Sequence, residues 1–425
     1  MIQRRSRMLL MATLALLASA CQRVPTAQTI DIPTGEGLEL IPNQLIVKYV
    51  DDRSTQALTR ITPSVEGAIH AESVGFDSAD DVQLVRLPKG SDDAAAIARY
   101  QQNPRVEWVM QNYRVTGKDV RAVQATSEPR MGEQWYLDRV GAPEAWNTSK
   151  GSGVVVAVLD TGVDFTHPDL AGQVINGPNY AGSGDPKDSF GHGTHVAGII
   201  AAKGDNGIGI SGVAPAAKVL NIEVLGADGS GSIFGIAKGI KYAADYAKKN
   251  HVHVVINMSL GGPARPDPIN YLAGKYAKLK GALLVAASGN SNGPVSTPGR
   301  LSDFLAVGAS TQADQRAPFS NFGPEVGISA PGVGILSTMP TYKVPLNDFK
   351  DSNGTPIGQN YALLQGTSMA TPIVSGVAAL VWSAHPDWTA AQVRERLQSS
   401  ARDLGAAGKD PEFGSGLVNA AAAVR

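Results

Sequence analysis

The chain has 425 residues, of which 43 % are hydrophobic, so it can build sizeable cores and is not a disordered protein as a whole. Lysine plus arginine number 37 and aspartate plus glutamate 38; the resulting net charge of −1 argues against the basic class of nucleic-acid-binding proteins. At about 150 residues per unit, this length predicts two or three units.

The first 21 residues have the layout of a secretory signal peptide. Arginines near the start precede an apolar run at 8–17, and the small residues 18–20 follow it. The run is about half as long as the roughly 20 residues that a membrane-spanning helix needs. It therefore predicts export and not a permanent transmembrane anchor.

Cys21 is the only cysteine in the sequence, which rules out an intrachain disulfide and a cysteine-based metal site. Small residues directly before it resemble a bacterial lipobox, although Ala18 stands where a larger aliphatic residue is usual. The alternative is ordinary signal-peptidase cleavage after Ala20, with Cys21 left in a discarded or exposed segment. We favour a lipoprotein precursor with a lipid anchor at Cys21, either secreted or attached to the outer face of a bacterial membrane.

A small α+β domain is expected between two polar linkers. Alternating apolar residues predict its strands, and an acidic cap predicts its helix. The linkers are 22–40 and 116–133, the domain is 41–115, its strands are 45–50, 82–87 and 106–109, and its helix is 94–101. About 75 residues bury only a marginal core.

Residues 134–425 alternate short apolar runs with helical patterns. The predicted strands are 153–159, 218–225, 252–258 and 282–287, and the predicted helices are 195–202, 233–249 and 270–279. Strands that alternate with helices indicate an α/β fold with a mainly parallel central sheet and helices on both faces. The active site of such a sheet is expected at the carboxyl ends of its strands.

Three residues in this large unit could together activate a nucleophile. Asp160 ends a buried strand, His192 lies between two glycines, and Ser368 stands where a helix should begin, with Pro372 in its first turn. Each alone has an ordinary structural explanation, since acids close many strands and serine often caps helices. Together they can form a triad in which the acid orients the base and the base activates the serine.

Two further residues, Asn290 and His195, bear on this interpretation. Asn290 follows the strand at 282–287 and offers an amide donor for an oxyanion. His192 and His195 are three residues apart, so a metal pair is an alternative, but His192 should precede the helix and no third ligand lies nearby. For His195 we favour a buried helix histidine.

The order Asp160, His192, Ser368 is that of subtilisin, and over about 290 residues the chain resembles the subtilisin-like serine proteases. The resemblance implies that Asp160 orients His192, the general acid and base. It also implies that Ser368 is the nucleophile, that Asn290 is the oxyanion donor, and that peptide bonds are hydrolysed through an acyl-enzyme.

The resemblance extends to the residues that meet the substrate. It implies that Ser259, Leu260 and Gly261 pair with an extended substrate backbone, and that Ser296 lies in the floor of the pocket for the residue before the cut. No cluster of acids occurs around Ser296. We therefore expect broad cleavage after neutral or apolar, fairly large side chains of protein and peptide substrates.

The domain at 41–115 resembles the subtilase propeptide, especially at 103–108 and at 112–113. This implies a domain that assists folding, occupies the active-site cleft and is cut off by the enzyme itself in the linker at 116–133. Parallel sheets fold slowly because their strand pairings are non-local, which fits a folding assistant. If Cys21 carries lipid, this cut would release the protease from the anchor.

The resemblance also implies structural calcium. Segments 167–170 and 206–210 resemble those that build the family's tight site, and oxygen donors suit this cation. The implied ligands are Asp169, Asn206, the backbone oxygens of Gly204, Ile208 and Ile210, and Glu128. An ordinary polar loop is the alternative.

Two other classes of function compete with the protease. The first is a catalytically silent binding protein with the subtilase fold at the cell surface, against which the intact set of Asp160, His192 and Ser368 argues. The second is a different hydrolase on a parallel sheet, against which the absence of Gly-x-Ser-x-Gly around Ser368 argues.

Overall fold

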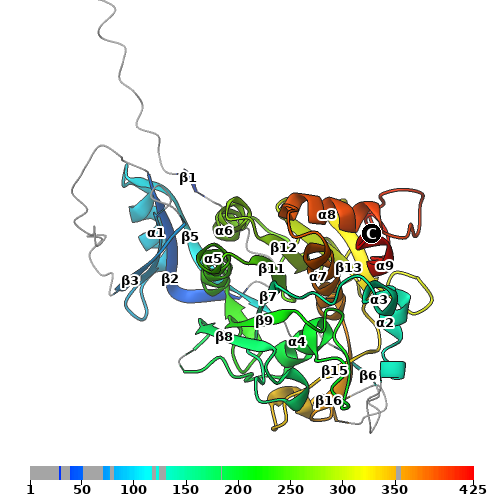
Figure 1. The fold of residues 1–425 in the computed structure, drawn as a ribbon. Helices are drawn as coiled ribbons and strands as arrows, with labels where there is room; N and C mark the ends of the chain where they lie inside the picture. Colours follow the sequence, from blue (N-terminus) through cyan, green and yellow to red (C-terminus); the bar gives the residue numbers. More distant parts are fainter. Residues whose placement is uncertain are drawn as a thin grey trace, which may run out of the picture.

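A computed structural model describes the chain at 28–29, 39–50, 70–76, 81–116, 121–123, 131–182, 184–350 and 356–425. The signal peptide, Cys21 and Glu128 lie outside the described residues. The described chain forms two units: a small N-terminal sheet with one helix, and a large sheet with helices on both faces (Figure 1).

The small unit is built on antiparallel strands that follow one another in space as β5-β2-β4-β3. Its elements are β2 (Leu40–Tyr49), β3 (His70–Gly75), β4 (Asp81–Arg86), α1 (Asp93–Gln101) and β5 (Val106–Thr116), and β1 (Gln28–Thr29) pairs with the outer edge of β5. Asp92 caps α1 by accepting the backbone N–H of Ala95 at 3.0 Å, and Tyr100 of α1 is fully buried against the sheet. The predicted strands and helix are confirmed, although β3 was not predicted and β5 extends further than expected.

The large sheet has seven strands, and all their pairings are parallel. In spatial order they are β14 (Val326–Pro331), β13 (Phe304–Ser310), β12 (Leu283–Ala287), β11 (His253–Met258), β7 (Val154–Asp160), β9 (Lys218–Glu223) and β8 (Val174–Asn179). Every residue of β7 is buried, as a strand covered on both faces requires. The α/β fold predicted from the sequence is confirmed.

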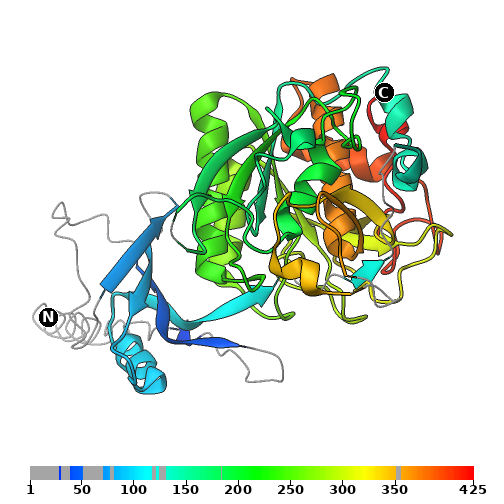
Figure 2. The same ribbon diagram turned by 90° about the horizontal axis from the view of Figure 1, so that it is seen from below.

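Two sets of helices cover the faces of this sheet, as the two ribbon views show (Figures 1 and 2). One face holds α4 (His192–Ala201), α7 (Thr367–Ala384) and α8 (Ala390–Ser399), and the other holds α5 (Ile233–Asn250) and α6 (Pro268–Leu279). Val156 packs in the core with α4 and α7, whereas Ala157 packs with α5 and α6. Successive side chains of β7 thus feed the two cores in turn, because a strand alternates its faces.

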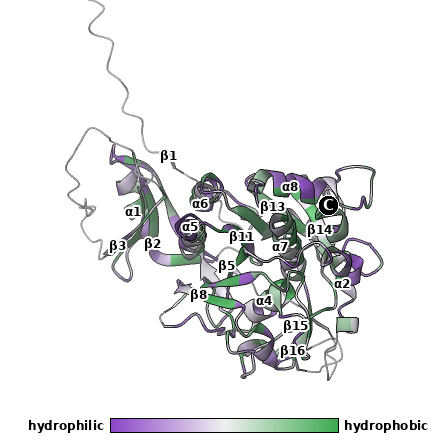
Figure 3. Ribbon diagram, in the orientation of Figure 1, coloured by the Kyte–Doolittle hydropathy of each residue, from purple (hydrophilic) through white to green (hydrophobic). Residues whose placement is uncertain are grey.

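Short elements complete the large unit. They are β6 (Arg121–Val123), η1 (Met131–Glu133), α2 (Trp135–Arg139), α3 (Ala142–Ala145), η2 (Pro168–Leu170), β10 (Ser230–Ser232), β15 (Ile335–Thr338), η3 (Pro345–Asp348), β16 (Tyr361–Gln365) and α9 (Ala420–Ala423). Helix α8 is mostly hydrophilic (Figure 3), and its two buried residues, Val393 and Leu397, lie four apart on its inner face.

Two details of the helices differ from the sequence-based predictions. Helix α4 begins at His192 itself, because Gly191 adopts a positive φ of 114° and turns the chain directly into the helix. Pro372 lies in the interior of α7 and not in its first turn. Among the described residues, α7 is the one helix long and apolar enough to cross a membrane, and it is 89 % buried in the protein, as a core helix is.

The small unit packs against the α5 and α6 side of the large one (Figure 2). Trp108 and Met110 of β5 share a core with Ile236 of α5. Ion pairs join the two units at the rim, including Glu72 with Lys238 and Arg114 with Asp228. Strand β5 thus reaches from the small sheet onto the large unit, where it ends at the site described next.

Candidate active site

Asp160 and His192 form a fully buried pair at the carboxyl end of the sheet. Asp160 is the last residue of β7 and His192 the first of α4, and Oδ1 of Asp160 lies 2.7 Å from Nδ1 of His192. The backbone N–H of Thr161 also donates to Oδ1, at 2.8 Å. The geometry assigns the proton of the neutral imidazole to Nδ1 and leaves Nε2 as the basic nitrogen.

The environment of His192 favours its charged form. Burial by itself lowers the pKa of His192, but the charge and hydrogen bond of Asp160, together with the charge of Asp188, outweigh burial and raise the pKa above its ordinary value. Nε2 is buried and has no hydrogen-bond partner among the described residues. The nitrogen that a base would use is thus not engaged elsewhere in this part of the chain.

Ser368 is the second residue of α7 and is 4 % exposed. Its hydroxyl donates to the backbone carbonyl of Ser259 at 3.1 Å and not to His192. The sequence predicts that His192 activates Ser368. The structure places His192 at the start of α4 and Ser368 at the start of α7, and these two helices pack together. A serine hydroxyl reaches a new acceptor by rotation about χ1.

The side chain of Asn290 is fixed by the residue before Ser368. Oδ1 of Asn290 accepts hydrogen bonds from the backbone N–H of Thr367 at 2.8 Å and from its hydroxyl at 2.9 Å. Since Oδ1 accepts from Thr367, the NH₂ group of the Asn290 amide points away from Thr367. Asn290 follows β12, as predicted from the sequence.

A small cavity of about 20 Å³ gathers most of the predicted substrate and oxyanion residues. It is lined by Thr116, Leu260, Gly261, Ala287, Gly289, Asn290, Ser296, Thr367 and Ser368. None of these residues is charged, so the described lining of the cavity offers no ion pair to a basic side chain. Ser259 is buried beside it and contributes the carbonyl that accepts from Ser368.

The sequence did not reveal that Thr116, from the N-terminal unit, lines this cavity. Its N–H and carbonyl exchange hydrogen bonds of 3.0 Å each with Gly261, and on its other side it pairs with Ser230 of β10. The end of β5 therefore lies between two segments of the large unit as a third strand. The side chain of Val115 packs directly against Gly262: a Cβ on residue 262 would lie 2.8 Å from Cγ1 of Val115.

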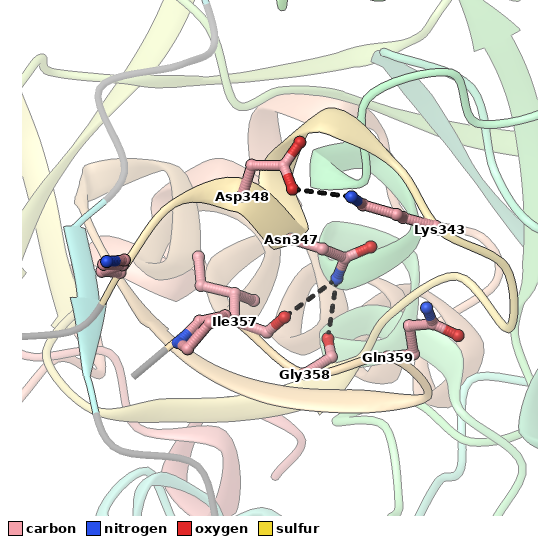
Figure 4. A pocket seen from close by; sticks show the side chains of 8 residues that line it. Lys343, Asn347, Asp348, Ile357, Gly358 and Gln359 are labelled. Carbon is pink, nitrogen blue, oxygen red and sulfur yellow. Dashed lines mark hydrogen bonds and ion pairs between the residues drawn. The ribbon is translucent and has the colours of Figure 1, made fainter. Parts of the chain in front are cut away.

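A larger cavity, of about 580 Å³, lies in the loops around η3 (Figure 4). Its lining comprises Lys343, Asn347, Asp348, Lys350, Pro356, Ile357, Gly358 and Gln359. Asn347 donates to the carbonyls of Ile357 and Gly358, and Lys343 pairs with Asp348 at 2.9 Å. These polar groups stabilise the loop itself, and the part of the lining that the structure describes contains no serine, cysteine or histidine.

His195 is a buried helix histidine, as the sequence analysis favours. Its Nε2 lies 3.1 Å from the carbonyl of Ala362, and burial lowers its pKa to about 3, so it is neutral at ordinary pH. Among the described residues, no group of three or more His, Cys, Asp or Glu gathers that could hold a metal. His192 and His195 thus do not form a metal pair with a third such ligand there.

Hydrogen bonds connect four of the predicted calcium ligands, Asp169, Asn206, Ile208 and Ile210. The carboxylate of Asp169 is fully buried and accepts hydrogen bonds from the side chain of Asn206 at 2.7 Å and from the N–H of Ile210 at 2.8 Å. The N–H of Ile208 donates to Oδ1 of Asn206 at 3.0 Å, while Tyr361 donates to Asp169 at 3.3 Å. The donor set of one carboxylate, one amide and loop carbonyls fits a hard cation such as calcium.

The parallel sheet covered on both faces, the buried Asp160–His192 pair and Ser368 at the start of α7 are the arrangement expected of a serine endopeptidase. Residues 151–416 match the subtilase family, and residues 26–112 match the fervidolysin N-terminal prodomain. The chain belongs to the subtilase family and carries a prodomain of the fervidolysin type.

Known relatives cover both units. Subtilisin Savinase from Lederbergia lenta is 46 % identical over 294 residues, which are 68 % of this chain and 98 % of Savinase. Alkaline elastase YaB from Bacillus sp. (strain YaB) is 36 % identical over 410 residues, 94 % of this chain and 97 % of that one.

Among solved structures, fervidolysin from Fervidobacterium pennivorans, a keratinolytic enzyme related to subtilisin, superimposes with a TM-score of 0.78 at 29 % identity. The match covers 94 % of this chain and 63 % of fervidolysin.

Proposed function

We propose that this chain is the precursor of a secreted serine endopeptidase in which Asp160, His192 and Ser368 hydrolyse peptide bonds, and that it processes itself. The observation that carries the proposal is the end of the prodomain strand, Thr116, which lines the same cavity as Ser368 and Asn290. A chain bound there in extended form is bound as a peptide substrate would be.

The proposed reaction uses the described geometry in two stages. Nε2 of His192 takes the proton of Ser368 as Oγ attacks the substrate carbonyl carbon, while Asp160 holds Nδ1. The amide group of Asn290 donates to the oxyanion. His192 then gives the proton to the leaving amine as the C–N bond breaks, and later removes a proton from the water that hydrolyses the acyl ester.

Two paired segments support a narrower position for the proposed cut. Thr116 pairs with Gly261, and Arg121 of β6 pairs with Gln365, three residues before Ser368. The chain therefore pairs with the large unit at both ends of the range 116–121. We infer that the cut falls between Thr116 and Arg121, a narrower range than the linker at 116–133 predicted from the sequence.

Expression of the full chain and of Ser368→Ala in a protease-deficient host tests both parts. The wild-type chain should give a mature protein whose first residue lies at 117–121 and which hydrolyses casein. Ser368→Ala should remain full-length and inactive. Identical processing of both proteins, with no hydrolysis by either, would instead support the silent binding protein at the cell surface.

The uncharged lining of the cavity supports the proposed preference for neutral or apolar, fairly large residues before the cut. The test is a peptide library with all residue types at that position. Cleavage confined to paired basic residues would contradict this preference.

Export and lipidation at Cys21 are further parts of the proposal and rest on the sequence of the first 21 residues. A cut between Thr116 and Arg121 would separate the protease from a lipid on Cys21. Labelling with a radioactive fatty acid should mark the wild-type precursor and not Cys21→Ser, and equal labelling of the two would exclude the anchor.

We also propose that Asp169, with Asn206 and the loop carbonyls of Gly204, Ile208 and Ile210, holds a structural calcium ion. The close approach of Asp169 and Asn206 supports this assignment. When bound, the ion would tie the loop at 204–210 to η2. Glu128, the remaining predicted ligand, lies outside the described residues.

A further inference from the structure

Asp188 is a second buried carboxylate next to the Asp160–His192 pair, and the reaction proposed above does not use it. It is 1 % exposed. Its Oδ1 accepts hydrogen bonds from the hydroxyl of Thr161 at 2.8 Å and from the N–H groups of Phe190 and Gly191 at 3.1 and 2.6 Å. Its Oδ2 accepts from the N–H and hydroxyl of Thr194, at 2.8 and 2.5 Å.

Several of these hydrogen-bond partners are direct neighbours of Asp160 or His192 in the chain. Thr161 follows Asp160, and its hydroxyl also accepts the N–H of Gly193 at 2.9 Å. Gly191 and Gly193 are the neighbours of His192 in the chain. Through one threonine hydroxyl, Asp188 therefore joins the end of β7 to the first turn of α4, and it satisfies N–H groups that a helix start leaves without partners.

The arrangement requires a carboxylate. Both oxygens of Asp188 only accept hydrogen bonds, and their five donors among the described residues are all neutral groups of the protein. Asparagine has the same shape, but its NH₂ group would face either the donors of Thr194 or those of Thr161, Phe190 and Gly191. It would therefore leave N–H groups unpaired in a buried place, where an unsatisfied donor destabilises the folded state.

We infer that Asp188 is a positioning residue for the proposed base: it holds His192 and Asp160 in register and stabilises the imidazolium with a second negative charge. This inference rests on the proposed function of the Asp160–His192 pair. It adds a residue that acts through the pair and does not touch the substrate.

The charges around Asp188 are compatible with this role. Burial raises the pKa of Asp188 to about 6, and its hydrogen bonds oppose that rise, so it is ionised at pH 8. Glu223, on β9, faces it with a pKa that burial raises to about 8. The hydroxyl of Tyr342 donates to the backbone carbonyl of Asp188 at 2.9 Å, and Nζ of Lys187 lies 4.1 Å from the Tyr342 ring centroid. His192 itself faces Asp160, Asp188 and the neutral His195.

The test compares Asp188→Asn with a matched control, Asp164→Asn. Asp164 is also fully buried, and its carboxylate accepts the N–H and hydroxyl of two threonines, Thr166 and Thr341, but none of these donors belongs to the segments that hold Asp160 and His192. Each variant is made as the full chain, and hydrolysis of a chromogenic peptide is measured from pH 5 to 10, with thermal unfolding as the check on folding.

For Asp188→Asn we expect kcat to fall roughly ten- to hundredfold at nearly unchanged KM, because the base is misplaced. The acid limb of kcat/KM should also move to lower pH, because one negative charge near His192 is lost. Asp164→Asn should lower the unfolding temperature and leave the pH profile as in the wild type. An unshifted profile in Asp188→Asn, or an equal shift in both variants, would overturn the inference.

A second variant covers the case in which Asp188→Asn does not fold. Thr161→Val removes the linking hydroxyl and keeps the charge of Asp188, so it should lower kcat without moving the acid limb. Full activity of Thr161→Val would contradict the positioning role. An inactive wild-type protein would instead refute the proposed function itself, which separates the two failures.

Discussion

Thr116 and Gly261 exchange two backbone hydrogen bonds, each of 3.0 Å, although 145 positions separate them in the numbering of the chain. One residue ends the prodomain strand β5 and the other lies just beyond the buried Ser259, whose carbonyl accepts the hydroxyl of Ser368. The relationship places the end of the prodomain strand in the lining of the cavity that we propose as the substrate site.

The contact between Val115 and Gly262 gives a way to weaken the prodomain without altering the triad. In Gly262→Ala the new Cβ would lie 2.8 Å from Cγ1 of Val115, closer than real Cβ contacts allow, so Val115 at the tail of β5 or residue 262 itself must shift. We expect self-processing to slow several-fold and the separated prodomain to inhibit less well, by about tenfold in Ki for a loss of about 1.4 kcal/mol.

Gly132→Ala is the control for this substitution, since a Cβ there meets no atom within 4 Å. Processing rates are followed by gel electrophoresis of the precursor, and Ki by titration of the mature enzyme with the separated prodomain. Equal processing and inhibition in the two variants would show that the tail tolerates the extra carbon.

Replacement of Asn290 by alanine should reduce turnover and leave binding nearly unchanged. An oxyanion donor acts mainly in the transition state, so kcat should fall roughly 10²- to 10³-fold with KM within about twofold. Thr367→Val should have a smaller effect of the same kind, because it removes one of the two hydrogen bonds that orient Asn290. Steady-state kinetics on a peptide substrate measure both, and a change confined to KM would contradict the assigned role.

Glu223 should make the stability of the folded protein fall as the pH rises from about 4.5 to about 8. Burial raises its pKa in the folded protein from the ordinary value of about 4.5 to about 8. Folding therefore favours the protonated form; this stabilisation is complete below about pH 4.5 and is lost as the pH rises through about 8. Glu223→Gln keeps the neutral shape and should flatten the decline in unfolding temperature between about pH 4.5 and about pH 8.

Thermal unfolding at several pH values, by circular dichroism in the Ser368→Ala background to prevent self-digestion, measures this effect. Glu325→Gln, at a half-buried glutamate that pairs with Arg300 at 3.7 Å, serves as the control. If both variants keep the wild-type slope, the carboxyl of Glu223 is not the group that titrates.

Calcium should raise the unfolding temperature through Asp169. Exchange of calcium for the chelator EGTA should lower the midpoint by several degrees in the wild type, since an ion that binds only the folded state stabilises it by mass action. Asp169→Asn should unfold at the same temperature with or without calcium. An unchanged midpoint in wild-type protein on chelation would argue against the site and leave Asp169 as a hydrogen-bonding residue of the loop.

The parts of the fold that follow from local pattern could be predicted from the sequence. Strand β7 is apolar at every position up to Asp160, and no structure other than a strand buried on both faces accommodates such a short β-branched run so readily. By contrast, β10 has the sequence Ser-Gly-Ser, which carries no strand preference. It is a strand because Arg114, Val115 and Thr116 lie beside it, and pairing over such a distance is invisible in a local window.

The same distinction applies to the site. Asp160, His192 and Ser368 could be found because each stands in a recognisable local setting, at the end of a strand or the start of a helix. Asp188 could not, since an acid four residues before a histidine is ordinary, and only the folded chain brings Thr161 and Thr194 onto its two oxygens. The start of α4 at His192 was missed for a related reason, because glycines on both sides of it suggested a loop.

Among the described residues, β10 pairs with no strand other than β5, and Gly261 forms its antiparallel bridge with Thr116. If the prodomain leaves after the proposed cut, both segments become open strand edges with unpaired N–H and carbonyl groups. The two edges then face each other across the gap that β5 had filled. A substrate fits this gap if it has several consecutive residues of extended main chain whose N–H and carbonyl groups are free to pair. In a folded protein the N–H and carbonyl groups are already hydrogen-bonded within its own helices and sheets. Such an enzyme would therefore select its substrates first by whether they are unfolded, and only then by their side chains.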